Sequence, residues 1–542
     1  MASLVIVVGA VIFLIASGTY AKSIEKAWGI DGDRPTPAHT LEDGVDYVPA
    51  PKMVLFGHHF SSIAGAAPVV GAIGASQFGW LPVAIWCVVA GVFIGGVQDF
   101  GALFASVRHG GKSIGEVIRE YVGTSGKRLF CVFAWFTTIL LAAAFFDIVA
   151  NTFISAPAAG TASLLFIFWA ICYGLATNKL GLNRNVCTVI GVILTFGSVW
   201  IGVKAPLVLS HTTWIWILVV YVLIAAIAPV WILLQPRDFL NRFLLYAMMI
   251  GAVIGIVVAH PSIQMPAFTG FYVNNTPLFP ILFVTLACGA VSGFHSLVGS
   301  GTTSKQVDNE KDMRMIGYTG MCLECFLALI ALVTVMWLPA DVRAEVTGKG
   351  ALYVFAYGLG HFLQLIGIPF ELGQTFGTLA LSAFAMTTLD TAMRLARYIC
   401  QEFAAGDKPV EEAIKTSKNP LVKPWPANLL GLVVATVLAF FGYGKIWSIF
   451  GSANQLLSAI ALMGIILFLR SIGKKYNMCR IPMIWMMCVA ICALAWNLYI
   501  NIGKNWALVI IAALLLVVAI ILFVRGFTSM SKKPEVEAAS DK

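Results

Sequence analysis

Long apolar stretches follow one another along the whole chain and constrain its fold more than any other feature. Of the 542 residues, 59% are hydrophobic and only 11% are charged, which lies far outside the range of soluble globular proteins. A membrane-spanning helix needs about 20 apolar residues, and about fifteen stretches meet that requirement. We therefore predict an all-α polytopic membrane protein. The predicted spans are Ser3–Gly18, Met53–Ser76, Leu81–Val107, Arg128–Ile154, Thr161–Thr177, Asn185–Val203, Thr213–Leu234, Asn241–Val258, Leu278–Ser304, Met315–Leu338, Leu372–Tyr398, Ala427–Phe441, Ile446–Leu469, Ile481–Ile500 and Trp506–Phe523.

The positive charges indicate how these spans are oriented. With the N-terminus placed outside, about 30 of the 35 Lys and Arg residues fall in loops on the inner side, as the positive-inside rule requires. A further apolar piece, Ala351–Ile366, is interrupted by Gly358, Gly360 and His361, and counting it as a span would invert every later loop. We therefore predict a surface or re-entrant helix there, an outer N-terminus and a cytoplasmic C-terminus. The net charge of +9 reflects loops and lipid contacts and indicates no nucleic-acid partner.

A short glycine-histidine phrase, G-x-H-x5-G, occurs twice inside apolar stretches. The first copy runs from Gly57 to Gly65 and the second from Gly293 to Gly301. Glycine-rich and hydroxyl-rich backbone is poor helix material, and at membrane depth it is tolerated only where it lines a polar cavity or is buried in protein. The two copies lie in the second and ninth predicted spans, which run in opposite directions. Two broken segments arranged in this way indicate the binding site of a transporter built from inverted repeats.

Further landmarks support two inverted halves. Asp147 and Asp390 each fall in the third span of a half, and amphipathic pieces at Ser113–Val122 and Ala351–Ile366 take mirrored positions. This order predicts a LeuT-like five-plus-five fold with discontinuous helices and additional accessory helices. The predicted segments are an N-terminal span and inside loop (1–52), the first repeat (53–203), two inserted spans (204–277), the second repeat (278–470), two C-terminal spans (471–526) and a disordered cytoplasmic tail (527–542).

Three longer motifs resemble a known family. FGHHFSSIAGAAPVVG, GGVQDFGALFASVRHGGKSIGEVI and ACGAVSGFHSLVGSGTTSKQ are similar to segments of the carbon starvation protein family, CstA, and the resemblance covers nearly the whole chain. The resemblance implies a transporter of the cell's inner (plasma) membrane that responds to nutrient limitation. Members of that family are associated with peptide uptake and with proton-coupled pyruvate uptake, so both substrates stay open.

The histidines and hydroxyls of the two phrases are the candidate substrate-binding residues. An ionisable residue at membrane depth is a functional-site candidate, and a histidine can change its charge near neutral pH. A carboxylate substrate needs N–H donors, which a half-helix N-terminus supplies together with its positive dipole end. Pro68 suits the first turn of a half-helix beginning near Ala66, so one predicted carboxylate pocket is Gly65–Val69 and the other is Gly299–Ser304. The predicted substrate-binding residues are His58, His59, Ser61, Ser62, Gly65, His295, Ser300, Gly301, Thr302 and Thr303.

Four acids inside predicted spans are candidates for ion coupling, because a carboxylate at membrane depth must be paired, hydrated or protonated. Asp147 and Asp390 stand out by their equivalent positions in the two repeats, and Asp99 follows a stripe of glycines that allows close helix packing. Glu324 is the fourth acid. We include Asp99, Asp147 and Asp390 in the predicted coupling site.

Thr387 and Thr388 place two adjacent hydroxyls in the third span of the second repeat and complete the predicted coupling site. In a LeuT-like arrangement they would frame a sodium site with backbone carbonyls near Ala64 and Ala67. Paired threonines in membrane helices also bond back to the preceding turn, which needs no ion. A proton is the expected coupling ion because the family resemblance favours it, and sodium stays open.

Catalytic and cofactor motifs are missing from the sequence. It has no phosphate-binding P-loop, no H-E-x-x-H and no nucleophile elbow, and its eleven cysteines have no zinc-binding or haem-binding spacing. We therefore expect a secondary active transporter without a cofactor, which imports a small carboxylate or a short peptide with a coupling cation. A membrane nutrient sensor acting through a partner protein and a passive channel are the alternatives. The oligomeric state stays open.

Overall fold

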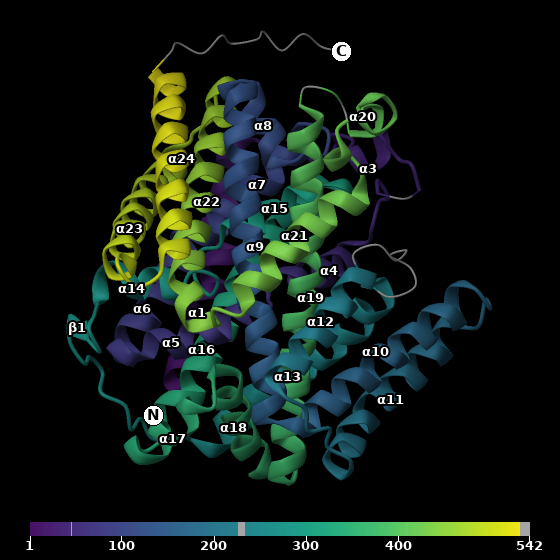
Figure 1. The fold of residues 1–542 in the computed structure, drawn as a ribbon, viewed down its shortest axis with the longest axis vertical. Coiled ribbons are helices and arrows are strands. Elements are labelled where there is room, and N and C mark those ends of the chain that lie inside the picture. Colours follow the sequence, from purple (N-terminus) through teal and green to yellow (C-terminus); the bar gives the residue numbers. More distant parts are fainter. Residues whose placement is uncertain (45, 226–233, 407, 409, 532–542) are drawn as a thin grey trace.

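Helices of membrane-spanning length make up most of the structure, a computed structural model that describes residues 1–44, 46–225, 234–406, 408 and 410–531 (Figure 1). Within this described part, ten helical spans are long and apolar enough to cross a membrane, or eleven if the bent pair α4 (Lys52–Ile63) and α5 (Ala67–Ala75) with its 3-10 extension is one span. The ten are Ser3–Trp28 (α1, Ser3–Gly18, and α2, Tyr20–Trp28), Trp80–Arg108 (α6, Trp80–Ala90, and α7, Gly96–Arg108), Thr124–Ser155 (α9), Pro157–Asn178 (α10), Arg184–Lys204 (α11), Pro236–Ala259 (within α13, Leu234–Ala259), Glu310–Met336 (ending in α16, Gly320–Met336), Tyr443–Ser471 (α22), Asn477–Asn501 (α23) and Trp506–Ser531 (α24).

The other predicted spans are also helical, but they do not meet the same criteria of length and hydropathy. They are short in α12 (His211–Ala225) and α21 (Pro424–Ala439) and broken between α14 (Leu278–Thr285) and α15 (Gly293–Gly301). Helix α19 (Phe370–Ala405), with 36 residues, is long enough to cross a membrane but is not among the ten helices that meet both criteria. The predicted span Thr213–Leu234 also includes residues 226–233, which lie outside the described residues. An all-helical membrane bundle is therefore confirmed, and the count of about fifteen spans stays a prediction.

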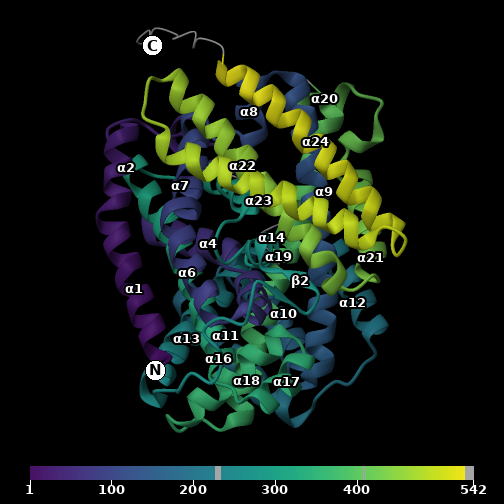
Figure 2. The same cartoon turned by 90° about the vertical axis from the view of Figure 1, so that its left-hand side faces the viewer.

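The N-terminus and the last described turn of α24 lie at opposite ends of the bundle (Figures 1 and 2). Following the charge-based prediction, we call the end that holds the N-terminus the outer end and the opposite one the inner end. Helix α24 continues to Ser531, so residues 527–531 are helical and not part of a disordered tail. The rest of that predicted tail, residues 532–542, lies outside the described residues. The shorter elements are α3 (Pro37–Thr40), α8 (Ile114–Val122), α17 (Ala340–Gly348), α18 (Ala351–Gln364), α20 (Val410–Thr416) and the antiparallel strands β1 (Tyr272–Val273) and β2 (Thr276–Pro277).

The two amphipathic pieces form helices at opposite ends, α8 at the inner end and α18 at the outer end (Figure 1). Helix α8 begins after Ser113, whose hydroxyl accepts a hydrogen bond from the Glu116 N–H as an N-cap. Helix α18 packs against α13, α16 and α19 and buries most of its side chains, among them Phe355 and Leu359. Of the two predicted alternatives for Ala351–Ile366, the surface helix is wrong, because the apolar side chains are covered by protein, and the re-entrant helix stays a prediction.

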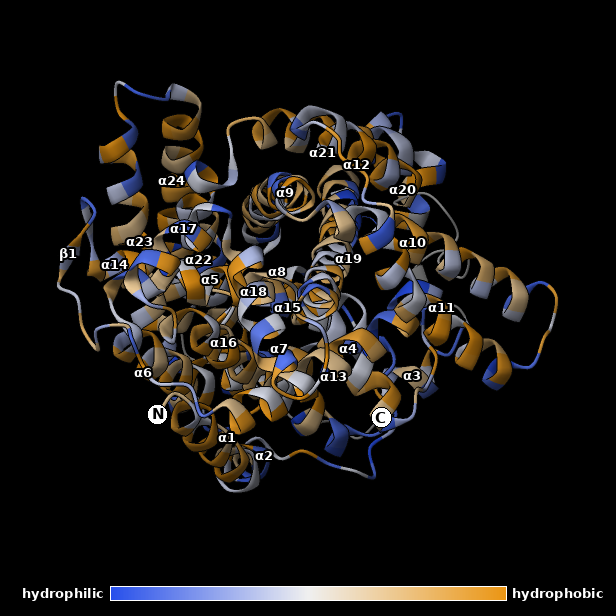
Figure 3. Cartoon of the chain, turned by 90° about the horizontal axis from the view of Figure 1, so that it is seen from below, coloured by the Kyte–Doolittle hydropathy of each residue, from blue (hydrophilic) through white to orange (hydrophobic). Residues whose placement is uncertain are grey.

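Apolar side chains cover the periphery of the bundle. Helices α11, α21 and α24 are largely orange in Figure 3, and Val189, Ile193 and Trp200 of α11 are exposed. In water such a surface would be unfavourable, whereas lipid tails solvate it at no cost. The central helices, above all α9, α16 and α22, bury most of their apolar side chains against neighbouring helices.

The two glycine-histidine phrases lie on different halves of their broken spans. Helix α4 ends at Ile63 and α5 begins at Ala67 after a bend of 48°, so the first copy precedes its break. Residues 286–292 form the second break, so the second copy follows its break on α15. The half-helices α4 and α15 pack side by side. The two breaks are confirmed, and the two copies lie on opposite sides of their breaks in the chain.

This arrangement also corrects one predicted carboxylate pocket. Residues 299–304 lie at the C-terminal end of α15 and in the turn that follows, where a helix presents carbonyls. They are therefore unsuited as an N-terminal donor set. The predicted start of the half-helix is confirmed, because α5 begins at Ala67 with Pro68 in its first turn, and the pocket there stays a prediction.

Candidate functional site

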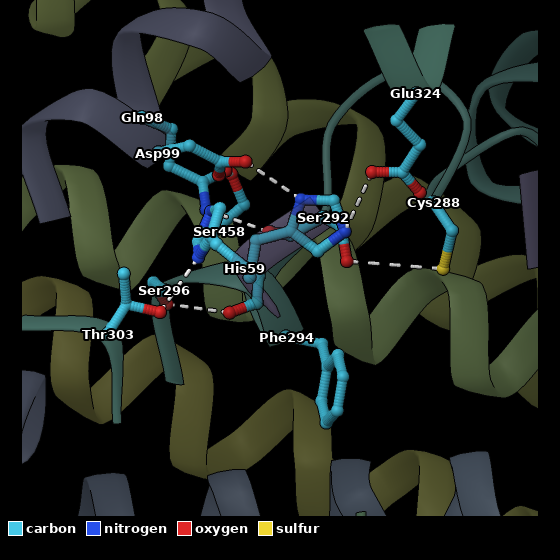
Figure 4. Close-up of polar contacts among 12 residues, drawn as sticks. His59, Gln98, Asp99, Cys288, Ser292, Phe294, Ser296, Thr303, Glu324 and Ser458 are labelled. Atoms are coloured by element: carbon cyan, nitrogen blue, oxygen red, sulfur yellow. Dashed lines mark hydrogen bonds and ion pairs between the residues drawn. The ribbon is translucent and has the colours of Figure 1, made fainter. Parts of the chain in front are cut away.

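His295 lies in the first turn of α15, directly after the second break, and is held between two carboxylates. Its Nδ1 is 2.8 Å from Asp99 Oδ2, within a hydrogen bond, and its Nε2 is 3.2 Å from Glu324 Oε2. Dashed lines in Figure 4 mark both contacts, to Asp99 on one side and Glu324 on the other. All three side chains are at most 1% exposed. We call Asp99, His295 and Glu324 the buried triad.

Irregular backbone surrounds all three members of the triad. Asp99 follows a π-helical turn, Gly91–Gly95, and Glu324 follows a second one, Arg314–Thr319. The two turns contact each other, and the Tyr318 hydroxyl of one donates to the Val92 carbonyl of the other at 2.8 Å. Single π turns inside helices occur frequently at functional sites. Together with the break before α15, they bring α7, α15 and α16 to one point.

Counting charges shows what the triad can do. If both acids are ionised and His295 is protonated, the triad carries one net negative charge, and no Lys or Arg of the described residues forms an ion pair with either acid. A net charge at membrane depth is unfavourable, so binding one further proton, which makes the triad neutral, is favoured. Asp99 Oδ1 and Glu324 Oε1 are buried without a hydrogen-bond partner and offer sites for that proton. The triad is therefore suited to bind and release a proton.

The same geometry makes the triad unsuited to a metal ion. The acids lie at opposite ring nitrogens of His295, so no single position between them lets all three side chains act as ligands. Within the described part of the chain, no group of three or more His, Cys, Asp and Glu side chains is placed to hold a metal.

A network of uncharged polar residues fixes the second break, and sequence reasoning missed it. Gln98, beside Asp99, donates to the Ser292 carbonyl at 2.7 Å and accepts from the Ser458 hydroxyl at 2.5 Å. Asn454 Oδ1 accepts from the Phe294 N–H at 2.9 Å, so it caps the start of α15. Asn454 and Ser458 lie four residues apart in helix α22, on one helix face. That spacing is the signal that would have pointed to them.

His59, the histidine of the first phrase, has a single neutral partner. Its Nδ1 lies 2.8 Å from the Thr303 hydroxyl, in the turn after α15, and its Nε2 is buried without a partner (Figure 4). The ring lies near Gly299 of α15 and Gly320 of α16, where an added Cβ would lie 3.9 Å and 3.7 Å from it. Thus the structure brings His59 and Thr303 together, as two of the predicted substrate-binding residues, and places them beside α15.

The other predicted binding residues of the phrases mostly serve their own helices. The hydroxyls of Ser61 and Ser62 donate to the His58 carbonyl, and those of Ser300 and Thr302 donate to Ser296 and Val298 carbonyls one turn earlier. His58 itself is partly exposed. Such back-bonding satisfies a hydroxyl inside a membrane helix without any ligand.

The predicted sodium region is brought together, but one of its hydroxyls is already engaged. A Cβ added to Gly65 would lie 2.2 Å from the Thr388 hydroxyl oxygen, so the first break packs tightly on α19. Thr388 Oγ1 is buried without a hydrogen-bond partner. Thr387 Oγ1, in contrast, donates to the Ala383 carbonyl and accepts from Asn241 Nδ2 at 3.2 Å.

Asp147 and Asp390 do not join the triad, and each faces a basic side chain from the inserted segment 204–277. Asp147 accepts from the Tyr443 N–H at 2.7 Å and lies 2.6 Å from His211 Nε2. Asp390 forms an ion pair with Arg237 and accepts from the Tyr221 hydroxyl at 2.8 Å. Arg237 was missed because the predicted spans left residues 235–240 as a loop, whereas α13 begins at Leu234 and buries this guanidinium completely.

The fold and the site define a class of protein. The structure superposes on a manganese transporter of Eremococcus coleocola with a TM-score of 0.54 at 12% identity, covering 90% of this chain and 98% of that one. That likeness concerns the fold alone, which is the LeuT fold of membrane transporters. With its two broken spans and its buried triad, the chain is a multi-pass membrane protein of this fold.

The sequence places it in a family. The model of the carbon starvation protein CstA family matches residues 1–349 and 340–493, and the chain belongs to that family. It is 32% identical to the peptide transporter CstA of Bacillus subtilis over 94% of each chain. It is 30% identical to the pyruvate/proton symporter BtsT of Escherichia coli, with 91% of this chain and 81% of that protein covered.

Proposed function

We propose that this protein is a proton-coupled importer of a small carboxylate such as pyruvate, or of a short peptide. The observation that carries the proposal is the buried triad, in which a histidine links two carboxylates from different helices at the second break. Relatives named as a peptide transporter and as a pyruvate/proton symporter support the same substrate classes and coupling ion.

In this proposal the substrate carboxylate binds at the start of α5. The first N–H groups of a helix have no partner within it, and no side chain caps this helix. Pro68 has no N–H, so Ala67 and Val69 supply the donors, assisted by the helix dipole. No buried cation is then needed to hold an anion at membrane depth.

Proton binding would change how firmly the two halves of the site hold together. In the deprotonated triad the net negative charge favours the histidinium form and ties α15 to α7 and α16. Protonation of either acid weakens its ion pair with His295, because a neutral carboxyl attracts the ring less. Movement of α4 and α15 against the remaining helices then alternates access to the site.

Sodium is a less suitable coupling ion in this arrangement. A sodium site needs several free oxygens, and the Thr387 hydroxyl already bonds with Ala383 and Asn241. The buried ion pair of Arg237 with Asp390 adds a fixed cation on the same two helices, α13 and α19. We therefore propose the proton, and the test below includes sodium.

Uptake by purified protein in liposomes tests substrate and coupling together. Pyruvate, lactate, dipeptides and tripeptides are offered under an inward proton gradient, with and without sodium, and with empty liposomes as the control. We expect saturable accumulation of at least one of these substrates that collapses when a protonophore is added. Accumulation that persists without a proton gradient and requires sodium would refute proton coupling, and the absence of any uptake would refute the substrate classes.

We also propose that the protein lies in the inner membrane with its N-terminus outside and its C-terminus in the cytoplasm. The opposite locations of the two ends in the bundle and the distribution of Lys and Arg support this orientation. Protease accessibility of tags at either end in intact cells tests it. A cleavable C-terminal tag on the cell exterior would reverse the assignment.

A further inference from the structure

A cavity of about 710 Å³ lies at the outer end of the bundle, between α5, α17, the start of α22 and the loop before β2. Ala344, Thr347 and Asn274 at its rim are exposed, whereas Val70 and Trp447 at its floor are buried. The cavity therefore leads from the surface into the protein. Its volume lies within the range of roughly 300–1,000 Å³ that is usual for small-molecule sites.

One charged residue lines this cavity, and it is a cation. Arg343 of α17 is half-buried, and its Nη1 donates to the Leu338 carbonyl at 3.3 Å. Among the described residues it forms no ion pair, in contrast to the nearby Lys349, which lies 2.9 Å from Glu345. None of the described residues that line the cavity is an acid. An unpaired guanidinium with free donors is suited to bind a carboxylate in two hydrogen bonds.

The floor of the cavity lies close to the proposed carboxylate pocket. Val70 belongs to α5 and follows Ala67 by three residues, which corresponds to about 4.5 Å along a helix axis. Tyr443 also lines the cavity, and its N–H donates to Asp147. Asp147 therefore helps to hold this part of the cavity lining in place. A solute in the cavity is therefore separated from the start of α5 by about one helical turn.

We propose that this cavity is a first binding site for the transported carboxylate, and that Arg343 binds the carboxylate group there. The inference rests on the proposed function, because it takes its ligand class from it. Tyr443 and Trp447 provide aromatic walls for the remainder of the solute, and the volume admits a short peptide as well as pyruvate. The solute then moves from Arg343 to the N-terminus of α5.

Transport kinetics of Arg343→Gln test this assignment, with Lys349→Gln as the matched control on the same segment. We expect R343Q to raise the KM for pyruvate and for dialanine by about ten-fold or more, with little change in kcat, because a charge-assisted contact is lost before the translocation step. We also expect wild-type protein to prefer dialanine to its C-terminal amide as an inhibitor of uptake, and R343Q to lose that preference. K349Q should match wild type. An unchanged KM and a retained preference in R343Q would overturn the proposal.

A labelling experiment keeps the test independent of transport. Thr347→Cys places a thiol at the exposed rim, and native labelling at the exposed Cys488 and Cys492 is subtracted using the wild-type protein. Pyruvate or dialanine should slow maleimide labelling of T347C when Arg343 is present and leave it unchanged in the R343Q background. Protection without uptake would refute the proposed function and keep the first site. Equal labelling rates with and without both solutes would refute the first site.

Discussion

The two glycine-histidine phrases share their letters but have different surroundings. His59 precedes its break, on α4, and meets the neutral hydroxyl of Thr303. His295 follows its break, on α15, and meets two acids from two other helices. Both histidines are almost fully buried, so exposure does not distinguish them. The same phrase therefore places one histidine beside a hydroxyl and the other between two acids, and the two copies differ in their position relative to the break.

The glycines at corresponding positions of the two phrases also have different surroundings. A Cβ at Gly293 would lie 2.4 Å from the Asn454 carbonyl oxygen, which is backbone and cannot move aside, whereas one at Gly57 would lie 3.3 Å from the Tyr246 hydroxyl. At the other end of the phrases, Gly65 packs on Thr388, whereas the nearest atom to a Cβ at Gly301 is 3.5 Å away. Each copy therefore needs one glycine for close packing, and it is not the same one.

The largest difference between the copies is expected for substitution of the two histidines. His295→Gln leaves two buried acids without their cation, and breaking a buried ion pair costs about 3–5 kcal/mol. We expect loss of proton-driven accumulation and a lower unfolding temperature, and we expect H295Q/E324Q to regain stability without regaining coupling. His59→Gln should fold and accumulate substrate. Proton-driven accumulation by H295Q at the wild-type level would remove the basis of the comparison.

Substitution of the first glycine of each phrase should give the second-largest difference between the two copies. Gly293→Ala forces α15 away from α22, and overpacking of this kind costs about 1–3 kcal/mol. Gly57→Ala should be nearly neutral, because the Tyr246 side chain can shift. Thermal unfolding in detergent, followed by size-exclusion chromatography, measures both. Equal stability of G293A and G57A would contradict the packing described for α15.

The last glycine of each phrase should give a smaller effect that a second substitution reverses. Gly65→Ala clashes with the Thr388 hydroxyl, so it should reduce uptake, and Thr388→Ala should restore it in the double variant. Gly301→Ala, the matched control, should behave as wild type. If T388A does not rescue G65A, the contact between the first break and α19 is not the cause of the defect.

The smallest effect is expected for the neutral contact of the first phrase. Thr303→Val removes the hydrogen bond to His59, and a single neutral hydrogen bond contributes about 0.5–1.5 kcal/mol. If the whole free energy of this hydrogen bond were lost from the transport step, uptake should fall by no more than about ten-fold, since about 1.4 kcal/mol corresponds to a factor of ten. The pH dependence of uptake should stay that of the wild type. A shifted pH profile in T303V would assign a proton-binding role to His59 as well.

The membrane bundle, the two breaks and several residues near them could be predicted from the sequence. The length of an apolar stretch and its glycine content are local properties of the chain. Asp99 was predicted for ion coupling and His295 for substrate binding, and the first break was expected near Thr388, on which Gly65 packs. Whether a phrase precedes or follows its break depends on where α4 ends and where α15 begins, and the letters of the phrase do not determine these positions. Arg237 was read as a loop residue because its charge interrupts hydropathy, although Asp390 neutralises it inside the protein.

Proton movement through the triad tests the central claim most directly. Wild-type protein and Asp99→Asn are placed in liposomes with a pH-sensitive dye inside, and both proton entry and exchange of labelled substrate are followed. The account predicts that substrate drives proton entry in the wild type, and that D99N exchanges substrate without moving protons, because Asn keeps the shape but cannot bind the proton. Asp147→Asn, which alters an acid outside the triad, should retain proton entry. Wild-type proton entry in D99N would contradict the assignment of the coupling proton to the triad.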